Sequence, residues 1–205
     1  MRIQLFNLLF ISIFFFLNSQ AIAKTPLVLF VGDSLTEGYG IEKKKAFPQL
    51  IKEKLKKDHQ KEISILNAGV SGSTSASALS RLRWFMKKDP ELVILALGAN
   101  DGLRGINPKE TYKNLKAALE FIKSKNKKVL FCGVRVPPNY GADFERAFLK
   151  TFSVLAKEQK VPFFPHILKD VAGEESLNQE DGIHPNEKGH QVMAKNLTPK
   201  VLELL

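Results

Sequence analysis

Three side chains in this sequence could form a serine-based catalytic site, although they lie far apart along the chain. Ser34 belongs to the segment Gly-Asp-Ser-Leu at 32–35, which directly follows an apolar run. A serine hydroxyl is a weak nucleophile at neutral pH and needs a neighbouring base. Asp181 and His184 lie close together near the C-terminal end of the sequence. One loop could therefore supply both the histidine base and the carboxylate that orients it.

Both motifs also have a structural explanation that requires no chemistry. Asp33 or Ser34 could cap a helix, since short polar side chains accept hydrogen bonds from the first free backbone N–H groups. The Asp-Gly pair at 181–182 could form a surface turn, with Pro185 at the start of the last helix. The sequence does not predict a metal site, because no second histidine or cysteine near His184 has ligand spacing.

Two segments rich in glycine and asparagine could stabilise the negative charge that acyl transfer develops on a carbonyl oxygen. They are Asn-Ala-Gly-Val-Ser-Gly-Ser-Thr at 67–74 and Gly-Ala-Asn-Asp-Gly at 98–102. Fixed N–H donors aimed at such an oxygen lower the barrier, and an asparagine amide adds a side-chain donor. Either segment could equally be an ordinary loop.

The elements that must position these residues follow from the hydropathy pattern. Short apolar runs without alternation predict buried parallel strands. The runs are Leu27–Gly32, Ile63–Ala68, Leu92–Leu97, Val129–Val134 and Val161–Phe164. Amphipathic stretches between them predict helices over Phe47–Lys57, Ala76–Lys88, Thr111–Lys125, Phe144–Gln159 and Asn186–Leu205. We expect Pro199 to break or kink the last helix.

Regular alternation of strands and helices predicts one α/β domain, a parallel sheet covered by helices on both faces. Ligands in such folds bind beyond the carboxyl ends of the strands. Ser34 follows the first predicted strand, and the segments 67–74 and 98–102 follow the second and third. The loop that carries Asp181 and His184 precedes the final helix. The topology therefore predicts that all these residues meet at one edge of the sheet.

Residues 1–23 have the features of a signal peptide that is removed on export. Arg2 gives a positive start, residues 5–17 are almost all apolar, and Ala-Ile-Ala at 21–23 fits a signal-peptidase site. The apolar run is shorter than the ~20 residues of a spanning helix, although an uncleaved membrane anchor is the alternative. The folded domain would then be residues 24–205, located in the periplasm or secreted, with no stable membrane insertion after cleavage.

Composition and charge limit the remaining classes of function. The 205 residues suit one domain, and 25% charged with 44% hydrophobic residues is typical of globular proteins. Cys132 is the only cysteine, which excludes an intrachain disulfide, and its apolar neighbours predict a buried side chain. The formal net charge of +10 comes from scattered lysines. We expect no nucleic-acid partner, because no reader motif is present; the sequence does not specify an oligomeric state.

Taken in order, four motifs resemble those of the SGNH, or G-D-S-L, hydrolase superfamily. They are Gly-Asp-Ser-Leu at 32–35, Gly72, Gly-x-Asn-Asp at 98–101 and Asp-x-x-His at 181–184. The resemblance covers essentially all of residues 24–205. Three segments are similar to one bacterial branch in particular, the multifunctional thioesterase, lysophospholipase and arylesterase branch. These segments are 98–105, 135–141 and 181–186. At Ser73 this chain departs from the acidic residue of that branch.

The resemblance implies a flavodoxin-like α/β/α sandwich with a five-stranded parallel sheet, and neither metal nor cofactor. It implies Ser34 as the nucleophile, His184 as the base and Asp181 as the third member of the triad. The oxyanion would be bound by the backbone N–H groups of Ser34 and Gly72 and by the side chain of Asn100. We expect the acyl group nearby, with three residues from the loops after the third and fourth strands as substrate contacts: Leu103, Pro138 and Tyr140.

These observations predict an exported serine esterase or thioesterase that works through an acyl-serine intermediate. Candidate substrates are small-molecule or lipid acyl esters: aryl esters, acyl thioesters and lysophospholipids. One alternative is an O-acetyl esterase acting on envelope polysaccharide, for which the sequence has few aromatic residues to stack on sugars. Another is a non-catalytic binder of anionic lipid surfaces, motivated by the positive charge. A complete serine, base, acid and donor set is not needed by a binder. Acyl-chain preference cannot be predicted, since one methylene changes binding by only ~1–3 kcal/mol.

Overall fold

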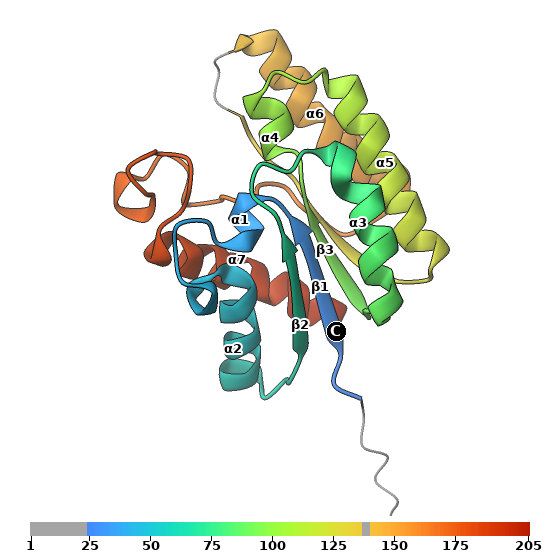
Figure 1. Cartoon of the computed structure of the whole chain (residues 1–205), viewed down its shortest axis with the longest axis vertical. Helices are drawn as coiled ribbons and strands as arrows, with labels where there is room; N and C mark the ends of the chain where they lie inside the picture. The colour runs from blue at the N-terminus through green and yellow to red at the C-terminus, as the bar shows by residue number, and fades with distance from the viewer. Residues whose placement is uncertain (1–23, 137–139) are drawn as a thin grey trace, which may run out of the picture.

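Five parallel strands form one sheet in the order β2-β1-β3-β4-β5 (Figure 1). The computed structural model describes residues 24–136 and 140–205. The strands are β1 (Leu27–Gly32), β2 (Ser64–Gly69), β3 (Leu92–Ala96), β4 (Lys128–Cys132) and β5 (Phe163–Phe164). This strand order is flavodoxin-like. It confirms the predicted fold class, while the predicted signal peptide at 1–23 and the candidate contact Pro138 lie outside the described residues.

Helices cover both faces of the sheet and complete the expected three layers (Figure 1). Helices α2 and α7 pack together on one face, and α5 packs between α3 and α6 on the other. The helices are α1 (Ser34–Glu37), α2 (Phe47–His59), α3 (Ala78–Phe85), α4 (Ala99–Leu103), α5 (Pro108–Ser124), α6 (Ala142–Gln159) and α7 (Glu187–Leu204). No helix of residues 24–136 and 140–205 is long and apolar enough to cross a membrane.

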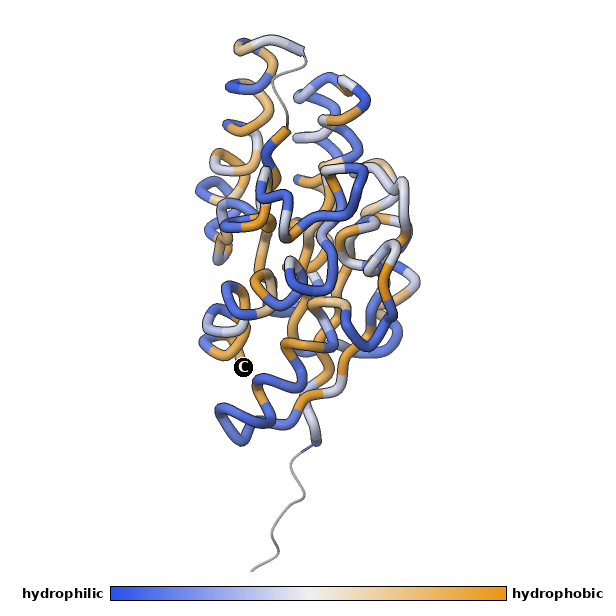
Figure 2. The backbone as a smooth tube through the Cα atoms, turned by 90° about the vertical axis from the view of Figure 1, so that its left-hand side faces the viewer, coloured by the Kyte–Doolittle hydropathy of each residue, from blue (hydrophilic) through white to orange (hydrophobic). Residues whose placement is uncertain are grey.

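The apolar runs of the sequence are buried because both faces of the sheet are covered. All residues of β3 are buried, as are those of β1 after its first residue. Edge strand β2 is partly exposed. Phe131 of β4 stacks on Phe152 of α6, and Figure 2 shows hydrophilic and hydrophobic residues alternating along the outer helices. The core thus lies between the sheet and the inward faces of the helices.

Helix α7 continues through Pro199, so the expected break does not occur. The hydroxyl of Thr198 donates to the carbonyl of Ala194 at 2.7 Å. A proline removes one backbone donor, but α7 has seven buried residues around it, among them Leu197 and Val201. Packing of this buried face on α2 offsets the lost hydrogen bond.

The turn that follows β1 is packed unusually close to the sheet. A Cβ atom on Gly32 would lie 1.9 Å from Thr36 Oγ1, and one on Gly69 would lie 2.2 Å from the backbone nitrogen of Glu37. Only glycine permits such an approach at the ends of β1 and β2. Helix α1 is therefore seated directly on the carboxyl edge of the sheet.

Candidate active site

Ser34 is the first residue of α1, immediately after β1. Asp33 is the N-cap of this helix, and its carboxylate accepts a hydrogen bond from the backbone N–H of Leu35 at 3.1 Å. Burial raises the pKa of Asp33 to about 7, although the hydrogen bond from Leu35 acts in the opposite direction. Asp33 therefore caps the helix, while the next residue, Ser34, is the candidate nucleophile. The structural and the catalytic explanations of this motif are compatible.

A chain of hydrogen bonds links Ser34 to the C-terminal loop. His184 Nε2 lies 2.9 Å from Ser34 Oγ, and His184 Nδ1 lies 2.6 Å from Asp181 Oδ2. The second oxygen of Asp181 accepts backbone N–H groups of Ile183 and His184, each at 3.0 Å. Burial alone would raise the pKa of Asp181, but these hydrogen bonds lower it to about 2. An ionised Asp181 keeps the proton of the imidazole on Nδ1, so Nε2 is free to accept from Ser34.

The loop that carries Asp181 and His184 is held to both neighbouring elements. Gln179 donates its side-chain N–H groups to the carbonyls of Tyr39 at 2.7 Å and Pro185 at 3.0 Å. Asn186 caps α7 by accepting from the backbone of Lys188 at 2.9 Å. These contacts fix the loop on the turn after α1 at one end and on α7 at the other.

Gly72 and Asn100 also reach this part of the molecule. Gly72 has a φ of 75°, a conformation that favours glycine. Within the described parts of the chain, the backbone N–H groups of Ser34 and Gly72 have no hydrogen-bond acceptor. Asn100 Nδ2 donates one hydrogen to the carbonyl of Ser73 at 3.1 Å, which leaves its second N–H available. Three N–H donors without an acceptor are thus present on residues that line the same cavity as Ser34.

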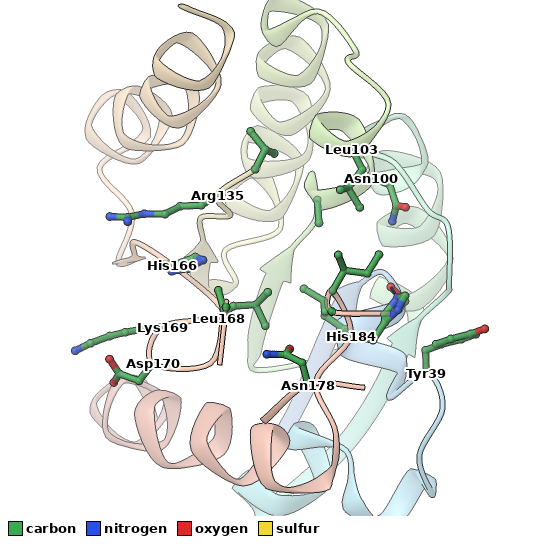
Figure 3. Close-up of a pocket in the computed structure, with 18 of the residues that line it drawn as sticks. Tyr39, Asn100, Leu103, Arg135, His166, Leu168, Lys169, Asp170, Asn178 and His184 are labelled. Carbon is green, nitrogen blue, oxygen red and sulfur yellow. Dashed lines mark hydrogen bonds between the residues drawn. The ribbon is translucent and has the colours of Figure 1, made fainter. Parts of the chain in front are cut away.

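The turn after β1, the segment around Gly72, the start of α4 and the loop with His184 all line one cavity of about 1250 Å³ (Figure 3). Ser34, His184, Gly72 and Asn100 contribute to its wall, and so does Leu103. The structure therefore brings five of the predicted site residues to one cavity, and Asp181 is hydrogen-bonded to one of them, His184. Tyr140, an expected substrate contact, is exposed and does not line this cavity. Its hydroxyl donates to the carbonyl of Leu103 at 3.2 Å, and a Cβ atom added to the glycine at 105 would lie 2.9 Å from its ring.

Several residues of the site were not predicted from the sequence. Asp101 is buried and accepts hydrogen bonds from the backbone and hydroxyl of Ser75 and from the hydroxyl of Thr111. It fixes the start of α4, and with it Asn100. Glu37 and Arg104 bind the loop around Gly72. Apart from the carboxylate beside Asn100, no local pattern marks these residues, because their partners come from distant loops.

The other unusual side chains are structural. His190 is buried, and its Nδ1 accepts the backbone N–H of Phe47 at 3.1 Å. Burial and the nearby His184 lower the pKa of His190 to about 4. Cys132 is buried in β4, and burial raises the pKa of its thiol. Across residues 24–136 and 140–205, no group of three or more acidic, histidine or cysteine residues is placed to hold a metal ion.

A Ser-His-Asp hydrogen-bond chain at the strand ends of an α/β sandwich is the arrangement of a serine hydrolase. Residues 30–192 match the GDSL-like Lipase/Acylhydrolase family, and the chain belongs to it. The esterase TesA of Pseudomonas aeruginosa is 35% identical over 190 residues, covering 92% of this chain and 93% of that protein. The thioesterase 1/protease 1/lysophospholipase L1 of Escherichia coli K12 is 38% identical over 184 residues, covering 87% and 86%.

A solved structure agrees with these sequence relatives. The psychrotrophic esterase EstA from Pseudoalteromonas, in a form inhibited by monoethylphosphonate, superposes with a TM-score of 0.82 at 30% identity. The match covers 86% of this chain and 97% of that one. Fold and family therefore agree with the superfamily resemblance drawn from the motifs, including its esterase and thioesterase branch.

Proposed function

We propose that the protein hydrolyses acyl esters and thioesters through an acyl-serine intermediate. The observation that carries this proposal is the distance of 2.9 Å between Ser34 Oγ and His184 Nε2, with Asp181 held at 2.6 Å on the other side of the imidazole. A serine in this arrangement has the base that it needs to become a nucleophile. Membership of the family and the esterase and thioesterase names of its relatives support the same reaction class.

In the proposed reaction, Ser34 Oγ attacks the carbonyl carbon while its proton passes to His184 Nε2. The C–O or C–S bond breaks as His184 gives this proton to the leaving group, and the acyl group stays on Ser34. Water then attacks the acyl carbonyl and gives a proton to His184, which returns it to Ser34 as the acid leaves. Asp181 remains ionised and stabilises the imidazolium at both stages.

The free N–H groups of Ser34, Gly72 and Asn100 would bind the oxyanion of both tetrahedral intermediates. Their role is supported by their place on the wall of the cavity that holds the serine hydroxyl. Loss of one such donor typically costs about 2.7–4 kcal/mol of transition-state stabilisation. The cavity wall is mostly apolar, and its volume of about 1250 Å³ far exceeds the space that an acetyl group needs. This favours longer acyl chains over O-acetyl groups as substrates.

We further propose that the enzyme is exported. The basic start, apolar run and small residues of 1–23 support a cleaved signal peptide and a mature enzyme of residues 24–205. The folded part supports this division, because β1 begins at Leu27, just beyond the predicted cleavage site. The mature enzyme would then act in the periplasm or outside the cell.

Replacement of Ser34 by alanine tests the mechanism. We expect kcat/KM for a medium-chain aryl ester to fall by at least about 10³-fold, because triad members contribute factors of this size or larger. A fluorophosphonate should add one adduct to the parent protein and none to Ser34→Ala, as measured by intact mass. Ser153→Ala is the matched control, since that hydroxyl only bonds its own helix at Lys150. Activity or labelling that survives in Ser34→Ala would overturn the proposal.

A further inference from the structure

The cavity that contains Ser34 extends well beyond the reacting groups. Figure 3 shows His184 and Asn100 on one side and Arg135, Lys169 and Asp170 on the opposite side. Its volume of about 1250 Å³ is larger than the roughly 300–1,000 Å³ of common small-molecule pockets. A substrate bound at Ser34 therefore has room to reach the far end of the same cavity.

Apolar side chains line the way between the two ends. Val136 and Phe164 are almost fully buried, and Leu168 is partly buried against the core. Leu168 lies between His184 and His166 in the close-up of the cavity (Figure 3). A methylene chain bound along these residues would be removed from water without burying polar groups. Each buried CH₂ would contribute about 0.8 kcal/mol of binding free energy.

The far end carries two exposed cationic side chains, Arg135 and Lys169, and one carboxylate, Asp170. Arg135 follows β4, and Lys169 lies in the loop after β5. Within residues 24–136 and 140–205, neither side chain forms a salt bridge or a hydrogen bond. Lys200 also lines this end, but it is paired with Glu203 at 2.7 Å. The one carboxylate there, Asp170, accepts a long hydrogen bond of 3.3 Å from the amide of the asparagine at 196.

We infer that Arg135 and Lys169 bind an anionic group, a phosphate or a carboxylate, carried by the substrate at the end remote from the reacting carbonyl. This inference rests on the proposed ester hydrolysis at Ser34. Guanidinium and ammonium groups form charge-assisted hydrogen bonds with both anions. The preferred substrate class is then an ester in which an apolar chain along Val136 and Leu168 separates the reacting carbonyl from the anion.

The inference predicts a measurable substrate preference. Three esters are compared: 4-nitrophenyl octanoate, the mono-4-nitrophenyl ester of octanedioic acid, and the octanoate ester of 8-hydroxyoctyl phosphate. The second carries its anion on the acyl chain and the third on the leaving group. The ratio of kcat/KM for each anionic ester to that for 4-nitrophenyl octanoate is measured in the parent and in Arg135→Gln/Lys169→Gln. We expect this ratio to fall about tenfold or more for the anionic ester that uses the site, the size of one charge-assisted hydrogen bond.

Lys160→Gln/Lys195→Gln is the matched control, because it removes the same charge from exposed positions outside the cavity. Its ratios should equal those of the parent. Equal ratios in Arg135→Gln/Lys169→Gln for both anionic esters would overturn the inference while leaving the esterase proposal intact. Should no ester be hydrolysed, the esterase proposal fails instead. Calorimetry then tests the anion site without catalysis. Octyl phosphate and octanedioate should bind more weakly to Ser34→Ala/Arg135→Gln/Lys169→Gln than to Ser34→Ala, and equal affinities would overturn the inference.

Discussion

His184 and His190 lie six residues apart in the sequence, yet the fold gives them opposite environments. His184 faces the serine hydroxyl at the cavity wall. His190 is 1% exposed and accepts a backbone hydrogen bond from Phe47. Its position on the inner face of α7, and not its residue type, decides that it remains neutral. This buried imidazole makes the stability of the protein depend on pH.

Replacement of His190 by glutamine should remove a pH-dependent part of the stability. Because the folded-state pKa of about 4 lies below the ordinary 6.5, the unfolded chain binds more protons between these values. Stabilisation by the neutral imidazole is therefore present above pH 6.5 and is lost as the pH falls toward 4. We expect the difference in unfolding free energy between parent and His190→Gln to shrink by up to about 3 kcal/mol from pH 7 to pH 4. Urea unfolding at several pH values measures it.

The test compares the parent with His190→Gln because Asp33 changes the pH dependence of stability in the opposite direction, and this effect is the same in both proteins. Its pKa rises from 3.8 to about 7, so the folded state binds more protons between these values. Its contribution is present at low pH and is lost as the pH rises toward 7. His59→Gln, at an exposed position, serves as the control and should leave the pH profile unchanged. A gap between parent and His190→Gln that does not vary with pH would contradict the assignment.

The sequence predicted the candidate reacting residues better than the residues that hold them in place. Ser34, Gly72 and Asn100 each follow a strand, and parallel strands bring their carboxyl ends to one edge. That rule needs only strand positions, which apolar runs reveal. Arg135 and Lys169 could not be predicted in this way. The sequence around a surface lysine or arginine looks the same whether the side chain lies at a cavity or in solvent. Their grouping depends on loop conformations that no local periodicity encodes.

At the scale of elements, two short helices hold the segment around Gly72 from opposite sides. Glu37 of α1 accepts from the backbone N–H of Ser71 at 2.7 Å and from its hydroxyl at 2.5 Å. Arg104, at the end of α4, donates to the carbonyl of Gly72 at 2.9 Å. Asn100 of α4 donates to the next carbonyl, that of Ser73. Peptide units on both sides of the one that carries the free N–H of Gly72 are thereby fixed.

This clamp predicts that Glu37 is a positioning residue for the proposed oxyanion site. Glu37→Ala should lower kcat about tenfold with little change in KM, because a displaced donor acts on the transition state and not on ground-state binding. Glu37→Gln should restore most of kcat, since its amide oxygen can still accept from Ser71. Steady-state kinetics on an aryl ester measures both. Glu53→Ala on the exposed side of α2 is the control.

A purely structural role for Glu37 would give another pattern. Both Glu37 variants would then lower the melting temperature together with kcat, and glutamine would bring no selective recovery of turnover. The hydroxyl of Ser71 holds the pKa of Glu37 below its usual range, so the carboxylate stays ionised at neutral pH. The clamp should therefore persist across the pH range in which a serine esterase works.

Helices α1 and α4 also show where sequence patterns fail for whole elements. They have four and five residues, which is too short for an amphipathic period to appear. The longer helices and most strands were predicted to within a few residues of their observed bounds. Strand β5 was overestimated, because only Phe163 and Phe164 pair with β4 at the sheet edge. Long elements can be predicted from hydropathy patterns. The formation of one-turn helices at the site depends instead on tertiary contacts.

At the scale of the whole molecule, the folded domain begins next to the proposed cleavage site after Ala23. Lys24 and Thr25 are exposed, and the carbonyl of Pro26 accepts the backbone N–H of Ser64 at 2.9 Å. Sheet pairing continues from Leu27 onward. Cleavage after Ala23 would therefore leave every strand of the sheet intact. The mature chain would keep a formal charge of about +9, since Arg2 is the one charged side chain among residues 1–23.

Expression of the full chain in a bacterial host should yield an exported protein that begins at Lys24, because a signal peptidase requires small residues at the positions of Ala21 and Ala23. Intact mass of the periplasmic fraction measures this. Ala23→Phe should block processing and leave the larger, membrane-associated species. A chain of residues 24–205 made without the leader should unfold at the same urea concentration as the processed protein, since the described sheet needs nothing before Pro26. Recovery of an exported protein that retains Met1, or failure of residues 24–205 to fold, would contradict the division at residue 23.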